Sequence, residues 1–118
     1  MPNTFFAGHV LTREAHQTVK DKHPTKVAVV VACESNMTPL AKRKFLVSRD
    51  LTLAQFMLIV RNRTQLQPEE ALFVFVDNTL PPLAATMGLL DKQFADRNTG
   101  FLLLTVAVEA TFGGWSLI

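Results

Sequence analysis

The sequence has few of the features that mark disulfide-rich, secreted or membrane-spanning proteins. Its 118 residues include a single cysteine, Cys33, and one thiol cannot form a disulfide within the chain. The longest apolar runs, Val27–Cys33 and Leu102–Val108 with its one threonine, are far shorter than the ~20 residues of a membrane-spanning helix. The N-terminus also lacks the basic and then apolar pattern of a signal peptide. We therefore expect one compact domain made in the cytoplasm.

The net charge is too small to indicate a polyanionic partner by itself. It is +2, although the basic residues are concentrated between residues 42 and 63. A basic surface can attract nucleic acid, but this segment lacks the exposed aromatic side chains interleaved with cations that base stacking requires, and the chain has no tyrosine. A basic nucleic-acid-binding domain is therefore the weaker alternative, and no nucleic-acid partner is expected.

Residues typical of catalysis are also sparse. The sequence has no phosphate-binding loop, no cluster of metal ligands and no pair of nucleophile and base. His9, His16 and His23 recur every seven residues, which in a helix places neighbours ~10 Å apart, too far to share one metal ion. Cys33 lies in an apolar strand, which favours a buried structural thiol. We expect no enzyme activity, no metal and no other cofactor.

The spacing of apolar residues predicts four strands and three helices. The clearest helix start is at Thr52, where Gln55 completes a capping box and the following apolar residues recur at the spacing of a core-facing helix. The predicted elements are a helix over 12–22, strands over 27–33 and 42–47, a helix over 52–63, a strand over 72–76, a weaker helix over 84–94 and a strand over 101–108.

The first and the last of these strands are apolar on both faces, which is typical of strands covered on both sides. We expect them to be neighbours at the centre of a mixed four-stranded sheet, with the helix over 52–63 packed across it. This α+β arrangement is the β-grasp (ubiquitin-like) fold, here preceded by an N-terminal helical arm. The expected organisation is an arm over 1–26, a ubiquitin-like domain over 27–110 and a flexible C-terminal processing tail over 111–118.

The sequence contains the stretches Lys42-Arg43-Lys44-Phe45-Leu46-Val47, Asp50-Leu51-Thr52, Gln55-Phe56, Phe73-Val74-Phe75-Val76-Asp77-Asn78-Thr79-Leu80-Pro81-Pro82, Gly100-Phe101-Leu102 and Thr111-Phe112-Gly113. Together they resemble the autophagy ubiquitin-like modifier family, to which GABARAP belongs. The resemblance extends from about Val27 to Gly113 and identifies a divergent member. Departures from the family's usual residues occur at Val27-Ala28, at Val47-Ser48 and at Ala15, which stands where the family has an acidic residue.

The resemblance implies that the C-terminus is processed. In that family a cysteine protease cuts after a Phe-Gly pair, here Phe112 and Gly113, and removes the residues from Gly114 onward. Activating and conjugating enzymes then pass the glycine carboxylate, as a thioester, to phosphatidylethanolamine. A residue without a side chain suits this chemistry, because each enzyme must approach the acyl carbon closely. We expect a cytoplasmic monomer before conjugation that then becomes attached to autophagosomal membranes, with conjugation to a protein lysine as the alternative.

The resemblance also implies a hydrophobic groove for cargo receptors that carry an aromatic-x-x-aliphatic motif, which adds a strand beside the strand over 42–47. Ordinary core packing is the favoured alternative for Val30 and Phe56, but not for Lys44 and Leu46, which begin an edge strand. The implied aromatic pocket consists of Val19, Ala28, Val30, Lys44, Leu46 and Phe101. The implied aliphatic pocket consists of Phe45, Val47, Leu51, Phe56 and Ile59. The cations expected to meet acidic residues beside the motif are Lys26, Lys44 and Arg61.

Overall fold

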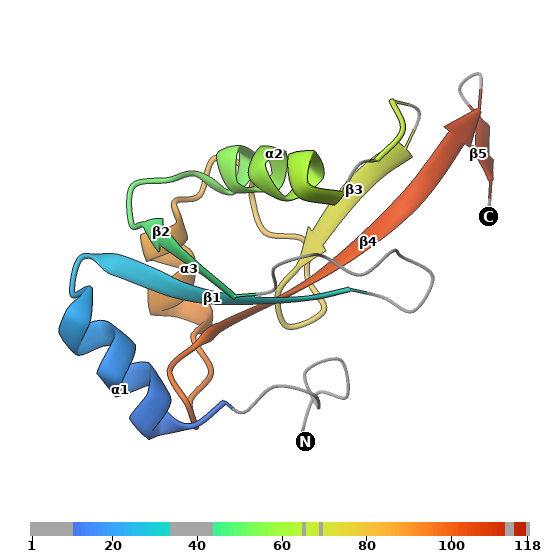
Figure 1. Ribbon diagram of the computed structural model, residues 1–118. Coiled ribbons are helices and arrows are strands. Elements are labelled where there is room, and N and C mark those ends of the chain that lie inside the picture. Colours follow the sequence, from blue (N-terminus) through green and yellow to red (C-terminus); the bar gives the residue numbers. More distant parts are fainter. Residues whose placement is uncertain (1–10, 34–43, 65, 69, 113–114, 118) are drawn as a thin grey trace.

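The computed structural model describes residues 11–33, 44–64, 66–68, 70–112 and 115–117. Its sheet has the strand order β2-β1-β4-β3, with β5 paired to the end of β4 (Figure 1). This mixed sheet with its packed helices confirms the predicted α+β, β-grasp architecture, including a helix before the first strand. The elements are α1 (Arg13–Lys22), β1 (Lys26–Cys33), β2 (Lys44–Ser48), α2 (Leu53–Thr64), β3 (Glu70–Phe75), α3 (Met87–Phe94), β4 (Leu102–Phe112) and β5 (Trp115–Leu117).

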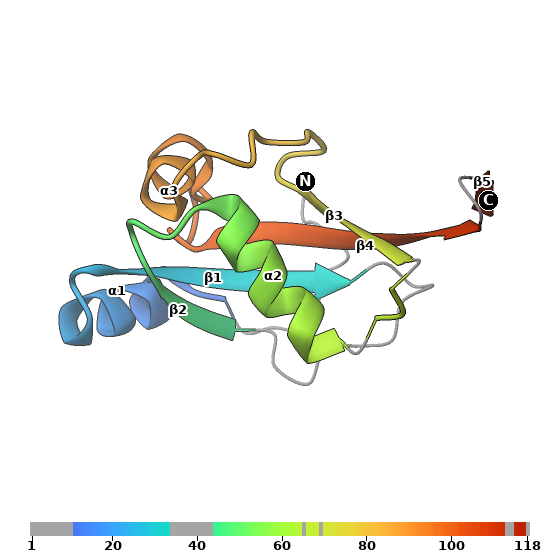
Figure 2. The ribbon, with the colours of Figure 1, turned by 90° about the horizontal axis from the view of Figure 1, so that it is seen from above.

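The two strands that are apolar on both faces lie side by side at the centre of the sheet, as their composition predicts. β1 pairs in parallel with β4 from Val29↔Leu102 to Cys33↔Val106. β2 pairs antiparallel with the other edge of β1, and β3 pairs antiparallel with β4. Residues 27–32 of β1 are all buried, because α2 and α3 cover one face of the sheet and α1 covers the other (Figure 1, Figure 2).

Alternating side chains of β1 belong to two separate cores. The larger core lies between the sheet and the helices α2 and α3, and the smaller core lies between the sheet and α1. The division follows from the two-residue period of a strand, in which successive side chains point to opposite faces. In β1 the larger core receives Val27, Val29 and Val31, and the smaller core receives Ala28, Val30 and Ala32.

The helix α2 begins where the capping box predicts. The Gln55 backbone N–H donates a hydrogen bond to Thr52 Oγ1 (3.2 Å), and the Thr52 backbone N–H donates one to Gln55 Oε1 (2.9 Å). These reciprocal bonds satisfy backbone donors that the first turn of a helix leaves unpaired. Leu53, Phe56 and Val60 are buried along one face of the helix, which fixes α2 across the sheet.

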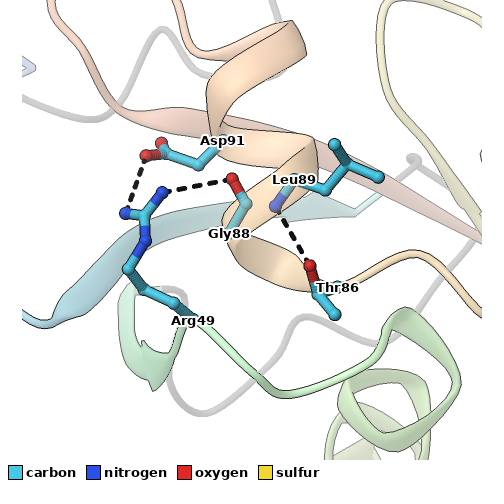
Figure 3. Close-up of polar contacts among 5 residues, drawn as sticks. All are labelled: Arg49, Thr86, Gly88, Leu89 and Asp91. Carbon is cyan, nitrogen blue, oxygen red and sulfur yellow. Dashed lines mark hydrogen bonds and ion pairs between the residues drawn. The ribbon is translucent and has the colours of Figure 1, made fainter.

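The turn after β2 is bound to the start of α3 (Figure 3). The N–H groups of Met87 and Gly88 donate to the carbonyl oxygens of Leu51 (2.7 Å) and Arg49 (2.9 Å). The Arg49 guanidinium donates to the Gly88 carbonyl (3.2 Å) and pairs with the Asp91 carboxylate (3.4 Å). A Cβ on Gly88 would lie 3.0 Å from the Arg49 carbonyl oxygen. The missing side chain thus permits this close approach, and Gly88 lies inside α3 without interrupting it.

The largest differences from the expected element boundaries are at the start of α3 and the end of β4. α3 begins at Met87, because the hydroxyl of Thr86 accepts a hydrogen bond from the Leu89 N–H (3.2 Å) and caps the helix there. β4 continues to Phe112, since β3 remains paired with it as far as Ala110. β5 pairs antiparallel with this last part of β4, between Ala110↔Leu117 and Phe112↔Trp115. The described part of the expected tail therefore has strand pairing, and its flexibility stays a prediction.

Candidate functional site

The strand β2 lies at one edge of the sheet, and within the described ranges β1 is the strand that pairs with it. The other side of an edge strand presents backbone donors and acceptors to which an extended peptide can add. Phe45 and Val47 are buried toward α2, whereas Lys44 and Leu46 are exposed on the side of α1. A peptide on this edge therefore has access to side chains of both faces.

The residues of the predicted aromatic pocket gather on the α1 face of the sheet. Leu46 lies opposite Ala28 in the β1–β2 ladder, and Lys44 lies opposite Val30. Val30 is 1% exposed and belongs to the core, which was the favoured alternative for this residue, while Leu46 is 44% exposed. The four predicted residues that meet in the smaller core are Val19, Ala28, Val30 and Phe101.

The residues of the predicted aliphatic pocket lie on the opposite face, against α2. The rings of Phe45 and Phe56 pack edge to face, with their centroids 5.5 Å apart. Phe56 is fully buried, so core packing describes it. Leu51 packs half-buried against the same core, and Ile59 is half-buried on α2. Leu51 and Ile59 are thus the predicted members that remain most accessible to a partner.

The three cations expected beside the motif differ in how their charged groups are used. Lys26 and Lys44 are exposed. The Arg61 guanidinium donates to the carbonyl oxygens of Glu70 (2.6 Å) and Gln67 (2.9 Å), so it holds the segment before β3 against the end of α2. A contact between Arg61 and an acidic partner stays a prediction, and it would have to share donors that already have a structural role.

The sequence interpretation did not include two contacts that border these residues. The His16 ring packs edge-on against Phe101, with centroids 5.1 Å apart and planes at 77°. The guanidinium carbon of Arg63 lies 5.8 Å from the centroid of the Phe45 ring, within the range of a cation–π interaction. The sequence signal for the first contact was the position of His16 beside Ala15 on the inner face of the helix. No sequence pattern predicts the contact between Arg63 and Phe45, because these residues lie on α2 and β2 and are brought together only by the fold.

The predicted processing site follows the end of β4. Phe112 is the last residue of that strand, whereas Gly113 and Gly114 lie outside the described residues. β4 continues beyond Val106, its last partner position with β1, and Figure 2 shows it projecting past the rest of the sheet. Regular strand structure therefore extends to the residue directly before Gly113.

The described ranges hold no group of three or more His, Cys, Asp or Glu side chains placed to bind a metal ion. Cys33 is a half-buried free thiol at the end of β1. No helix among the residues that the structure describes is long and apolar enough to cross a membrane. The arrangement that these residues do form is an edge of the sheet with apolar clusters on both of its faces.

Comparison with protein families gives a match over residues 12–113 to the model described as "Autophagy protein Atg8 ubiquitin like". Autophagy-related protein 8b of Arabidopsis thaliana is 45% identical over 98 residues, which cover 81% of this chain and 80% of the relative. Autophagy-related protein 8 of Colletotrichum higginsianum is 44% identical over 112 residues, covering 90% of this chain and 68% of the relative. The family match includes α1, the strands β1 to β4 and the position of Gly113.

A solved structure gives the same result for the fold. The crystal structure of Trypanosoma brucei ATG8 superposes with a TM-score of 0.78 at 33% sequence identity, covering 96% of this chain and 100% of that chain. The similarity therefore includes the helix before the first strand as well as the β-grasp sheet.

Proposed function

Because the chain belongs to the Atg8 family of ubiquitin-like autophagy proteins, we propose that it is conjugated to phosphatidylethanolamine through the carboxylate of Gly113. Members of this family are modifiers and not enzymes, so the reacting thiols belong to other proteins. A processing cysteine protease hydrolyses the bond between Gly113 and Gly114. Activating and conjugating enzymes then carry the Gly113 acyl group as a thioester and transfer it to the lipid amine on autophagosomal membranes.

The observation that supports this proposal most directly is the course of β4. The strand ends at Phe112, immediately before Gly113, and it projects beyond its pairing with β1 (Figure 2). An acyl group at that point is held away from the body of the domain, where three different enzymes can approach it. Glycine also leaves the acyl carbon without a side chain that would obstruct them.

The β2 edge supports the second part of the proposal, which is the recruitment of cargo receptors. A receptor segment with an aromatic-x-x-aliphatic motif adds a strand to β2, and its two apolar side chains contact the α1 face and the α2 face. Leu46 on the first face and Leu51 on the second are accessible from this edge. The protein on the membrane then binds receptors while its C-terminus is occupied by the lipid.

Intact-mass measurement tests the processing step. Cytosolic extract that contains the matching protease should remove five residues and leave Gly113 as the C-terminus. The substitution Gly113→Ala should abolish attachment to membranes, because it adds a side chain at the acyl carbon. The matched control is Gly114→Ala, which changes the neighbouring glycine in the segment that is removed and should leave attachment intact.

The same measurement on material extracted from membranes identifies the acceptor. A mass increase equal to phosphatidylethanolamine supports the proposal, whereas an increase equal to another protein would assign a lysine as acceptor. A chain that remains uncut, or that ends at Gly114, would contradict the assignment of Gly113.

A further inference from the structure

Two segments of the chain contain no charged residue although part of each is exposed. They are residues 51–60, which lead from the turn after β2 into α2, and residues 78–90, which lead from the turn after β3 into α3. Charged side chains are the usual cover of a protein surface. Apart from Leu46, the large apolar side chains that the structure describes as exposed all belong to these two segments. They are Leu58, Leu80, Leu83 and Leu89, between 45% and 61% exposed.

Backbone hydrogen bonds join the two segments. The N–H of Ala54 donates to the carbonyl oxygen of Leu83 (3.1 Å), and the N–H of Leu53 donates to that of Ala85 (2.8 Å). Leu58 follows Ala54 by four residues, so the two lie on the same face of α2. The exposed residues Ala54, Leu58 and Leu83 therefore form one apolar surface, which we call the leucine face.

The leucine face and the proposed receptor edge lie on different sides of α2. Ile59, which belongs to the predicted aliphatic pocket, directly follows Leu58, and successive residues of a helix are about 100° apart around its axis. Ile59 and Arg63 are four residues apart and share a side of the helix. The Arg63 guanidinium lies over the Phe45 ring of β2. That side of α2 thus points to β2, whereas Ala54 adjoins the segment before α3.

The leucine face is too small to hold a separate protein from solution. Stable interfaces between proteins involve about 20–30 residues on each side and a polar rim. A small apolar surface contributes when the protein is already held beside its partner, because the effective concentration is then high. The lipid proposed at Gly113 would hold the protein beside a bilayer in this way. The bilayer is therefore the partner for which the size of the leucine face is sufficient.

The arrangement of the elements and the lack of charge both favour this partner. In Figure 1 α2 and the C-terminal end of β4 lie toward the top of the view, while α1 covers the other face of the sheet. The exposed polar neighbours of Leu58 on α2 are Gln55 and Asn62, which are uncharged. Such a surface can enter the region between the headgroups and the acyl chains without removing a charge from water.

We propose that the leucine face rests on the bilayer to which the C-terminus is attached, and so orients the domain with α2 toward the lipid and α1 away from it. The proposal rests on the lipid attachment described under Proposed function and adds a second contact with the same membrane. In this orientation the β2 edge, on the other side of α2, stays open to a receptor.

Quenching of tryptophan fluorescence by brominated lipid tests this contact. A chain that ends at residue 114 lacks Trp115, the only tryptophan of the sequence. Gly114→Cys then couples it to maleimide-bearing phosphatidylethanolamine in phosphatidylcholine vesicles, and Cys33→Ala removes the other thiol. Ala54→Trp places a single reporter on the leucine face, and Thr18→Trp places one on the exposed side of α1 as control. Dibromo-phosphatidylcholine should quench the Ala54→Trp reporter severalfold more strongly. Equal quenching of the two reporters would overturn the proposal.

Substitutions then identify the side chains that make the contact. Leu58→Gln combined with Leu83→Gln should lower the quenching of the Ala54→Trp reporter severalfold, because amides replace the apolar groups. Leu46→Gln is the matched control, since it changes an exposed leucine on the α1 side of the sheet, and it should leave the quenching unchanged. Salt at about 1 M should also leave it unchanged, because screening acts on charges. Quenching that salt abolishes would assign the orientation to charged residues and overturn the proposal.

Other occupants and failure of the lipid attachment give different results. A blue shift of the reporter that grows with the surface density of protein, without quenching by brominated lipid, would assign the leucine face to a second copy and overturn the proposal. The coupling needs no processing or conjugating enzyme, so absence of quenching rejects the inference by itself. If the coupled protein is quenched but the protein from cells carries no phosphatidylethanolamine, the leucine face is correct and the proposed attachment is wrong.

Discussion

Gly100 occupies a position where both the backbone conformation and a neighbouring side chain exclude any residue larger than glycine. Its φ of +93° lies in the region that L side chains rarely adopt. An added Cβ would lie 2.6 Å from Nδ1 of His16. The turn that contains it is fixed by hydrogen bonds from the N–H of Gly100 to the Asp96 carbonyl (2.7 Å) and from the N–H of Thr99 to the Asp96 carboxylate (3.0 Å). Gly100 therefore joins the turn to β4 at a point that also contacts α1.

Substitution of Gly100 by alanine should destabilise the protein by about 2 kcal/mol, because of the unfavourable φ and the collision with His16. Chemical denaturation monitored by circular dichroism measures the difference. In a His16→Ala background the collision is absent, so the same substitution should cost less while the backbone penalty remains. A Gly100→Ala protein as stable as the parent would show that the turn does not require glycine.

At the level of elements, the five residues of β2 combine a structural role with the proposed binding of receptors. Its buried residues, Phe45 and Val47, anchor it to the larger core, and its exposed residues are available to the proposed receptor. Leu46 is 44% exposed although it is apolar. The exposed part of this side chain remains in water after folding. A bound peptide that buries it would gain hydrophobic free energy from removing that apolar surface from water.

Leu46→Ala should therefore weaken the binding of motif peptides by about tenfold and change the free energy of unfolding by less than about 0.5 kcal/mol. Titration calorimetry gives the first quantity and chemical denaturation gives the second. Leu58→Ala is the matched control, since Leu58 is 59% exposed on α2 and lies outside the predicted pockets. Unchanged peptide binding in Leu46→Ala would mean that the pocket has been assigned to the wrong residues.

The pairing of β5 with β4 is the second feature at this scale. It adds three residue pairs next to the proposed cleavage site, between Ala110↔Leu117 and Phe112↔Trp115. Proteases bind their substrates as extended chains, so β5 must separate from β4 before the bond can be cut. A pairing of this length is weak by itself, and it should slow processing without preventing it.

Leu117→Pro removes a backbone donor from β5 and fixes φ, which opposes strand pairing. We expect the initial rate of proteolytic processing to rise severalfold, with the cleavage position unchanged. Mass spectrometry over a time course measures both quantities. Leu117→Ala, which keeps the backbone N–H, is the control and should be processed at the parental rate. Equal rates for the proline variant and the parent would show that β5 pairing does not limit processing.

Over the whole molecule, the proposed lipid attachment and the proposed receptor site lie in different regions. The C-terminal end of β4 projects from the sheet at the end away from α1 (Figure 1, Figure 2), whereas the smaller core lies between α1 and the sheet. Both regions are connected through β1 and β4, which pair along the centre of the sheet. With the proposed attachment of the C-terminus to a membrane, this separation would leave the β2 edge accessible.

The amino-acid sequence by itself determined the elements from α1 to β4, the central pair of strands and the family, but not the strand β5. These are properties of local pattern: β1 and β4 are apolar on both faces, and Thr52 and Gln55 mark the start of α2 by a capping box that the structure confirms. The motif around Phe112 and Gly113 is also local, so a family could be recognised without knowledge of contacts.

Only the tertiary structure decided how individual side chains are used, because that depends on partners distant in the sequence. Arg61 donates its guanidinium to backbone carbonyls before β3, and Arg49 binds the start of α3 across 39 residues. His16 reaches Phe101 only when α1 packs on the sheet. The smaller core likewise results from α1, β1 and β4 meeting in space, and no single stretch of sequence contains it.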